Sequence, residues 1–120
     1  MHLDMQGRRA IVIEAHARPY SDPVSVRVGE IVVPDLSMKT DVTGWIWCRG
    51  PDGREGWTPA AWIDQSLDPW RMLRDFNAIE LDLAIGDELT LSFSESGFVW
   101  ARTKDGREGW APDGALELIG

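Results

Sequence analysis

One segment of twenty residues occurs twice in this chain of 120 residues. Residues 44–63 pair without a gap with residues 97–116, which lie 53 positions later, and ten of the twenty pairs are identical. Most of the other pairs exchange one residue for a similar one. Because repetition at a fixed spacing indicates repeated structural units, we expect two copies of one small unit, each of about 50–60 residues.

The repeated segment has the pattern of a β-hairpin. In the first copy, residues 45–49 and 54–58 form short strands, and the Pro-Asp-Gly sequence at 51–53 is a strong hairpin-turn signal. The following residues 59–61 fit a single helical turn. Across the whole chain, short apolar runs alternate with Gly- and Pro-containing turns, and no segment of helical length has a 3.6-residue period. This pattern predicts an all-β chain built from small barrels.

The net charge of −8 argues against two classes of partner. An acidic chain repels both phosphate backbones and anionic lipid surfaces, so we expect no nucleic-acid or membrane partner. Residues 1–9 contain no long apolar run after their basic pair, so no signal peptide is predicted and a cytoplasmic location is expected. The seven tryptophans are an unusual number for this length, and tryptophan serves both small cores and binding hot spots.

The residues needed for catalysis or for metal binding are scarce. The chain has two histidines, His2 and His16, and one cysteine, Cys48, which is too few for a metal-ligand cluster. Cys48 lies in the middle of a predicted strand, where we expect a buried and unreactive thiol. No Gly-rich phosphate loop is present. The sequence therefore predicts a protein that is not an enzyme and that uses no cofactor or metal.

Short motifs in a fixed order give the chain a resemblance to a known family. The second copy has Met-Leu-Arg-Asp-Phe, Glu-Leu-Asp-Leu-Ala-Ile-Gly-Asp, Gly-Phe-Val-Trp-Ala and Gly-Trp-Ala-Pro-Asp-Gly-Ala-Leu, at residues 72–76, 80–87, 97–101 and 109–116. The first copy has counterparts of the last three at residues 23–30, 44–48 and 56–63. The order and spacing resemble those of SH3 domains, and the chain as a whole is similar to bacterial SH3-like proteins built as tandem repeats. The resemblance implies two tandem SH3-like small β-barrels, at residues 8–64 and 71–119, joined by a short connection at 65–70.

The resemblance also implies a function and a site. SH3 domains are not enzymes, and they bind extended Pro-rich segments in an aromatic groove beside acidic residues. Matching positions in the first copy are the expected ligand-binding residues Tyr20, Asp22, Trp45, Pro59 and Trp62. Matching positions in the second copy form an expected secondary groove of Phe76, Glu80, Phe98 and Pro112.

Departures from the family pattern distinguish the two copies. Ile13 and Ala15 stand where the family has two groove tyrosines in the first copy. In the second copy Arg74 stands where a ligand proline would stack, and Ala115 replaces the last groove tyrosine. Ligand binding is therefore expected in the first copy, with the second copy degenerate or structural.

Three functional hypotheses follow. The leading one is a non-catalytic module that binds an unidentified protein or peptide, with a Pro-rich or basic segment as the expected ligand. An alternative is a structural tandem-barrel protein or a homodimer, in which tryptophans such as Trp45 and Trp62 fill an interface between repeats or subunits. A third is the binding of cell-wall peptides, which the absence of a signal peptide disfavours.

Overall fold

The computed structural model describes residues 2–40 and 43–119 of the chain. In these ranges the predicted all-β character is confirmed, because the helices are limited to two 3-10 turns of three residues, η1 (Ala60–Trp62) and η2 (Asp113–Ala115). Neither turn is long or apolar enough to cross a membrane. The strands divide between two compact units, which are described separately below.

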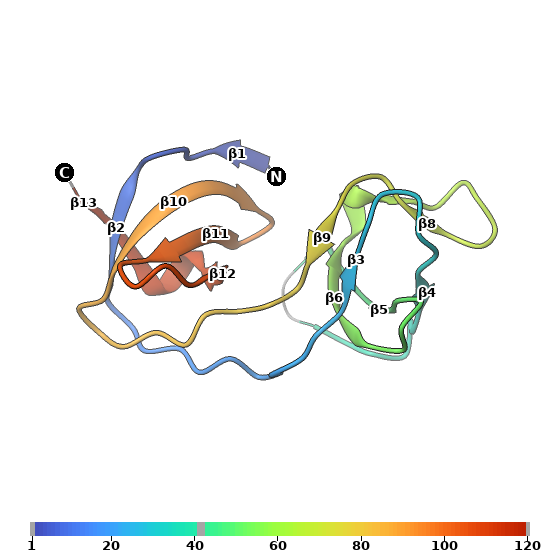
Figure 1. Ribbon diagram of the computed structural model, residues 1–120, viewed down its shortest axis with the longest axis horizontal. Coiled ribbons are helices and arrows are strands. Elements are labelled where there is room, and N and C mark those ends of the chain that lie inside the picture. Colours follow the sequence, from blue (N-terminus) through green and yellow to red (C-terminus); the bar gives the residue numbers. More distant parts are fainter. Residues whose placement is uncertain (1, 41–42, 120) are drawn as a thin grey trace. The chain divides into compact units, whose positions relative to one another are not determined.

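Unit 1 is formed by two distant parts of the chain, the part up to Pro19 and the part from Glu80 onward. Its sheet has the strand order β12-β11-β10-β2-β13, and β1 also pairs with β10 (Figure 1). The strands are β1 (His2–Asp4), β2 (Arg9–Val12), β10 (Glu88–Glu95), β11 (Phe98–Thr103), β12 (Glu108–Pro112) and β13 (Leu116–Ile119).

The core of unit 1 lies on the inner face of this sheet. Its buried residues are Ala10, Val12, Leu81, Leu83, Leu89, Leu91, Val99, Ala101 and Ala111. Alternate residues of β10 and β11 point inward, as expected for half-buried strands. The pairing of β10 with β11 shifts register between Leu91 and Phe93, and such a bulge bends the long strand over the core.

Unit 2 is continuous in sequence, from Tyr20 to Ile79. Its strands form a three-stranded sheet in the order β4-β5-β6 and two two-stranded sheets, β3-β9 and β7-β8. The strands are β3 (Ser25–Val26), β4 (Val33–Pro34), β5 (Trp45–Arg49), β6 (Glu55–Pro59), β7 (Ile63–Asp64), β8 (Arg71–Met72) and β9 (Phe76–Asn77). Within the described residues, the strand pairing closes into a ring in neither unit.

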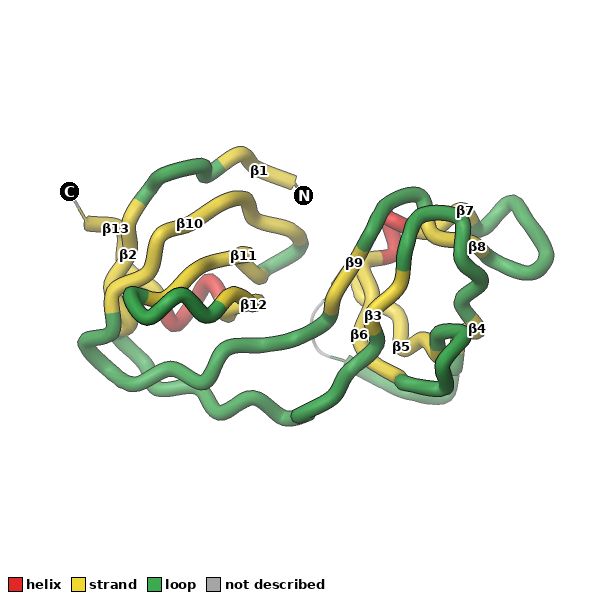
Figure 2. The backbone as a smooth tube through the Cα atoms, viewed as in Figure 1, coloured by secondary structure: helices red, strands yellow, loops and turns green. Residues whose placement is uncertain are grey.

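The repeated segment folds in the same way in both units. Each copy is a hairpin, β5–β6 or β11–β12, followed by a 3-10 turn that is drawn in red in Figure 2. Gly53 and Gly106 occupy equivalent turn positions with φ of +87° and +91°. Residues with a side chain rarely adopt this left-handed conformation, which explains the Asp-Gly pair in both turns.

The first strand of each sequence copy pairs with the other copy. In unit 1, β2 belongs to the first copy but lies between β10 and β13 of the second, so that in Figure 1 a blue strand is flanked by orange and red ones. In unit 2, β8 and β9 belong to the second copy but pair with β7 and β3 of the first. Each unit thus combines the opening segment of one copy with the remainder of the other.

The residues grouped in these units are not those of the consecutive ranges 8–64 and 71–119 that the SH3 resemblance implies. The connection at residues 65–70 is short, and a short loop loses little entropy when β7 and β8 close over it as a hairpin. Because β8 pairs with β7, the place between β10 and β13 of the second copy is filled by β2. The opening strands of the two copies are thus exchanged, and for this reason the boundaries of the compact units differ from the boundaries of the sequence copies.

Candidate functional site

The β5–β6 hairpin brings aromatic residues to one face of unit 2. Trp45 and Trp47 are two positions apart on β5, so their side chains point to the same face. Opposite them on β6 lie Pro59 and Trp57, respectively. The rings of Trp47 and Trp57 meet edge to face, with centroids 5.1 Å apart. The hairpin therefore forms a strip of three indoles and one proline.

Tyr20, from the loop before β3, extends this strip. Its ring packs edge to face on Trp47, with centroids 5.2 Å apart. Trp47 is 8% exposed beneath it, whereas Tyr20 is 39% exposed. The predicted ligand-site residue Tyr20 therefore forms the solvent side of this contact.

Phe76 joins the other end of the strip to Trp62. Its ring centroid lies 6.4 Å from that of Trp45 and 5.5 Å from that of Trp62. Phe76, Trp62 and Pro59 are buried, whereas Trp45 is half-buried. Of the predicted first-copy groove, Pro59 and Trp62 thus form the base, while Trp45 keeps part of its surface accessible to solvent.

Arg74 covers the face of Trp62. Its guanidinium carbon lies 3.9 Å from the ring centroid, within the range of a favourable cation–π contact. The SH3 resemblance placed this arginine in the groove of the second copy. In the structure it lies on Trp62, which belongs to the first copy. The ring face that a ligand would use at Trp62 is therefore occupied by a side chain of the same molecule.

The residues that present aromatic area to solvent are therefore Tyr20, Trp45 and Trp57, with Trp47, Trp62 and Phe76 beneath them. We call these six residues the aromatic surface. Trp57 was not among the residues expected at the site, although its position opposite Trp47 in the predicted hairpin was an available signal. The sequence also did not place Phe76 in this surface or Arg74 over Trp62, because both positions depend on the strand exchange.

Asp22 lies in an ion-pair cluster two positions after Tyr20 in the chain. The Arg54 side chain binds Asp22 at 2.9 Å and Asp52 at 2.7 Å. These two carboxylates raise the pKa of Arg54, and the Arg54 backbone amide and guanidinium lower the pKa of Asp52. Two carboxylates share one guanidinium, so the cluster keeps one net negative charge, and the Asp22 side chain is 76% exposed.

The expected secondary groove is only partly assembled. Phe98 and Pro112 are direct partners across β11 and β12, and both are half-buried. Phe76 belongs to unit 2 instead. Glu80 Oε1 lies 2.9 Å from His16 Nε2, within hydrogen-bond distance. Burial raises the pKa of Glu80, and the contact with His16 partly offsets that increase. The structure therefore joins two of the four predicted residues directly.

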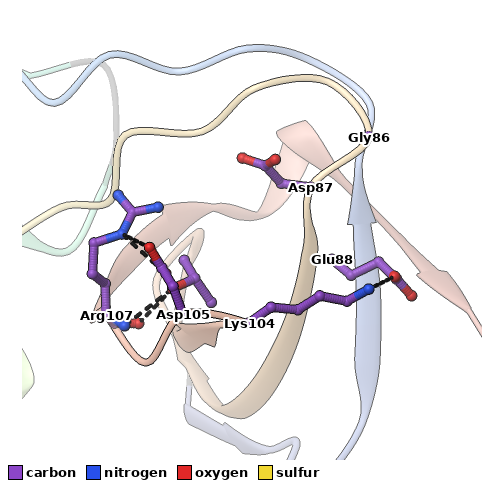
Figure 3. Close-up of a pocket in the computed structure, with 7 residues that line it drawn as sticks. Gly86, Asp87, Glu88, Lys104, Asp105 and Arg107 are labelled. Carbon is purple, nitrogen blue, oxygen red and sulfur yellow. Dashed lines mark hydrogen bonds and ion pairs between the residues drawn. The ribbon is translucent and has the colours of Figure 1, made fainter.

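A polar pocket of about 290 Å³ lies on unit 1 between β10 and the β11–β12 turn (Figure 3). Four of its five charged lining residues form ion pairs, and the fifth, Asp87, accepts a hydrogen bond from the backbone N–H of Ala84. Glu88 binds Arg9 and Lys104, each at 2.5 Å, and Arg107 binds Asp105 at 3.1 Å. These pairs neutralise most of the local charge, so the pocket resembles an ion-paired surface rather than a site for a charged ligand.

Cys48 has the environment that its position predicted. It is fully buried in unit 2 and forms no disulfide, and burial raises the pKa of its thiol to about 11. A hydrogen bond with Thr58 offsets the increase only in part. The described part of the chain also contains no group of three or more His, Cys, Asp or Glu side chains arranged to hold a metal ion.

Comparisons of the chain with protein-family models, with curated proteins and with solved structures each found no match.

Proposed function

We propose that the chain is a non-catalytic module of two SH3-like units that binds a protein or peptide through the aromatic surface of unit 2. The observation that carries this proposal is the partial exposure of Tyr20, Trp45 and Trp57 above a packed aromatic base. Rigid aromatic side chains provide a large contact area at a small entropy cost, which makes them the commonest anchors of binding sites.

The charge beside this surface favours a ligand with a basic residue. Tyr20 is followed closely by Asp22, whose cluster with Asp52 and Arg54 retains one net negative charge. A ligand Arg or Lys at Asp22 would gain a charge-assisted hydrogen bond without burying an unpaired carboxylate. An extended Pro-rich segment that carries a basic residue combines the two features, because a polyproline helix is already ordered before it binds.

The corresponding surface of unit 1 supports binding less well. Phe98 replaces Trp45 at the equivalent position, and Ala115 replaces Trp62. Trp110, which is equivalent to Trp57, is 2% exposed. Unit 1 therefore offers less accessible aromatic area, which is why we assign the ligand to unit 2.

The proposal is tested by titrating the ¹⁵N-labelled protein with a library of Pro-rich peptides that carry Arg or Lys. Each indole N–H gives its own NMR signal, so shifts at Trp45 and Trp57, with Trp100 and Trp110 unchanged, are the expected result. Trp45→Ala and Tyr20→Ala should each weaken binding, by about 2 kcal/mol or more if they are anchors. Phe98→Ala, the matched change in unit 1, should leave the affinity unaltered.

Two outcomes would contradict this proposal. One is unchanged affinity in a folded Trp45→Ala variant. The other is the absence of any indole shift together with a mass that rises with protein concentration and falls in the tryptophan variants. The second result would support a homodimer in which the aromatic surface is the subunit interface.

A further inference from the structure

Unit 2 carries a second pocket, of about 400 Å³, whose floor is apolar. Ile31 and Val33 line it, and they are 36% and 45% exposed. Val32, between them, is fully buried. Because alternate residues of an extended segment point to opposite faces, Ile31 and Val33 present two aliphatic side chains to solvent on the same side.

Two arginines flank this floor. Arg71 pairs with Ile31 through an antiparallel bridge, and Arg49 is the register partner of Val33 in the β4–β5 pairing. The Arg71 guanidinium donates a hydrogen bond to the backbone carbonyl of Gly29 at 2.9 Å. This bond fixes the position of the guanidinium and uses one of its five N–H donors, so the others can bind a ligand. Both arginine side chains belong to exposed residues that line the pocket.

These two arginines differ from five of the other ten basic residues of the chain. Arg9, Arg18, Arg54, Lys104 and Arg107 each form an ion pair with a carboxylate. By contrast, neither Arg49 nor Arg71 forms an ion pair with any residue that the structure describes. The lining of this pocket therefore holds two guanidinium groups that form no ion pair with the described residues, in a protein with a net charge of −8.

One carboxylate lines the same pocket and does not cancel this charge. Glu30 accepts a hydrogen bond from the backbone N–H of Arg27 at 2.7 Å, so one of its oxygens closes the turn before Ile31. With Arg49, Arg71 and Glu30 counted together, the pocket lining keeps one net positive charge.

We propose that this pocket is a second binding site, separate from the aromatic surface, for an acidic peptide segment with an aliphatic residue between its carboxylates. The aliphatic side chain would bury itself on Ile31 and Val33. The flanking carboxylates would pair with Arg49 and Arg71, whose planar guanidinium groups match a carboxylate with two parallel hydrogen bonds. The ligand charge is opposite to that favoured beside Asp22, so the two surfaces select different segments.

The test uses the full chain, ¹⁵N-labelled, and the blocked peptide Asp-Glu-Ile-Glu-Asp at low ionic strength. We expect shifts of the Nε–Hε signals of Arg49 and Arg71 and of the backbone amides of Ile31 and Val33. The affinity should fall as salt is added, because exposed ion pairs are screened. The uncharged peptide Asn-Gln-Ile-Gln-Asn is the matched probe and should give no such shifts.

Single substitutions then show which side chains bind the acidic peptide. Arg49→Gln and Arg71→Gln should each weaken binding by about three- to tenfold, as expected for partly exposed charge-assisted contacts. Glu30→Gln should strengthen binding because it removes the one carboxylate among the lining residues that the structure describes. Arg102→Gln is the control, since Arg102 occupies the position of Arg49 in the other sequence copy and should leave the affinity unchanged.

Several results would overturn the proposal. These are equal binding of the uncharged peptide, unchanged affinity in both Arg49→Gln and Arg71→Gln, and an equal loss in Arg102→Gln. Shifts confined to the indoles of Trp45 and Trp57 would place the acidic peptide on the aromatic surface and would also refute a second site. Thermal unfolding of each variant confirms folding, and Arg49→Gln is the cleaner change because Arg71 also bonds to Gly29.

Discussion

Phe76 and Trp62 pack edge to face, with ring centroids 5.5 Å apart and an interplanar angle of 89°, although the sequence repeat assigns them to different copies. Phe76 also contacts Trp45, so a residue of the second copy completes the aromatic layer of the first. In the first copy, Ile13 and Ala15 stand at the positions where the SH3 family has two groove tyrosines, so its opening segment supplies no aromatic residue there. The strand exchange supplies one from elsewhere in the chain.

Deletion of residues 1–19 tests this exchange. The deletion removes β2 from its place between β10 and β13, so we expect unit 1 to unfold while unit 2 stays folded. In an NMR spectrum, the indole signals of Trp100 and Trp110 should lose their dispersion while that of Trp47 keeps its position. Loss of the Trp47 signal instead would mean that each opening strand pairs within its own copy.

Phe76→Ala should strongly destabilise unit 2. Phe76 is 4% exposed and contacts two indoles, and truncation of a buried phenylalanine costs about 3–5 kcal/mol. Urea unfolding followed through the Trp45 and Trp62 indole signals measures this loss. Phe98→Ala is the control, because Phe98 is half-buried and lies in unit 1, so the unit 2 signals should unfold at the wild-type urea concentration. A loss below about 1 kcal/mol in Phe76→Ala would contradict the described packing.

Arg74→Ala should expose the face of Trp62. The loss of the cation–π contact is expected to cost unit 2 about 0.5–1 kcal/mol, the usual value at exposed sites. If the aromatic surface binds basic Pro-rich peptides, the same change should strengthen that binding, because it removes a competing cation from an aromatic ring. Peptide titration of the variant against wild type gives the comparison, and weaker binding in Arg74→Ala would show that Arg74 supports the ligand instead.

Cys48 should resist thiol reagents while the protein is folded. With a thiol pKa of about 11, only about one molecule in a thousand carries the thiolate at pH 8, and the side chain is fully buried. A colorimetric disulfide reagent at pH 8 should therefore react at the rate at which unit 2 opens, and at once in denaturant. Rapid modification of the native protein would contradict the buried position.

Glu80 should make stability depend on pH in a defined direction. Burial is the main cause of its raised pKa, above the ordinary value of 4.5, so folding favours its neutral form. That contribution is fully present below pH 4.5 and is lost as the pH rises through the raised pKa of the folded state. The difference in unfolding free energy between wild type and Glu80→Gln should therefore shift against wild type from pH 4 to pH 7.

Denaturation curves at several pH values give this difference. Subtracting the Glu80→Gln curve is necessary because carboxylates with lowered pKa, such as Glu88 and Asp105, lose their stabilising contribution as the pH falls. A difference between the two proteins that stays constant with pH would contradict a raised pKa at Glu80.

Local features of the fold could be read from the residues. The strand at 45–49, the turn at Asp52 and Gly53, the helical turn after Pro59 and the buried Cys48 all match the structure. Each depends on near neighbours in sequence, namely on alternation, on a glycine that tolerates positive φ, and on a small apolar residue facing a core. The SH3 resemblance placed Tyr20 among the expected ligand-binding residues, and in the structure its ring packs on Trp47.

The sequence by itself determined that the chain is all-β, that it contains one hairpin unit twice, and that most tryptophans gather in the first copy. Only the tertiary structure decided which copy each opening strand joins, and with it the place of Arg74 and Phe76 against Trp62. The physical reason is that two copies with the same strand pattern offer equivalent edges to β2 and β8. Their local sequence therefore does not distinguish the partners, and the choice depends on loop closure and packing over the whole chain.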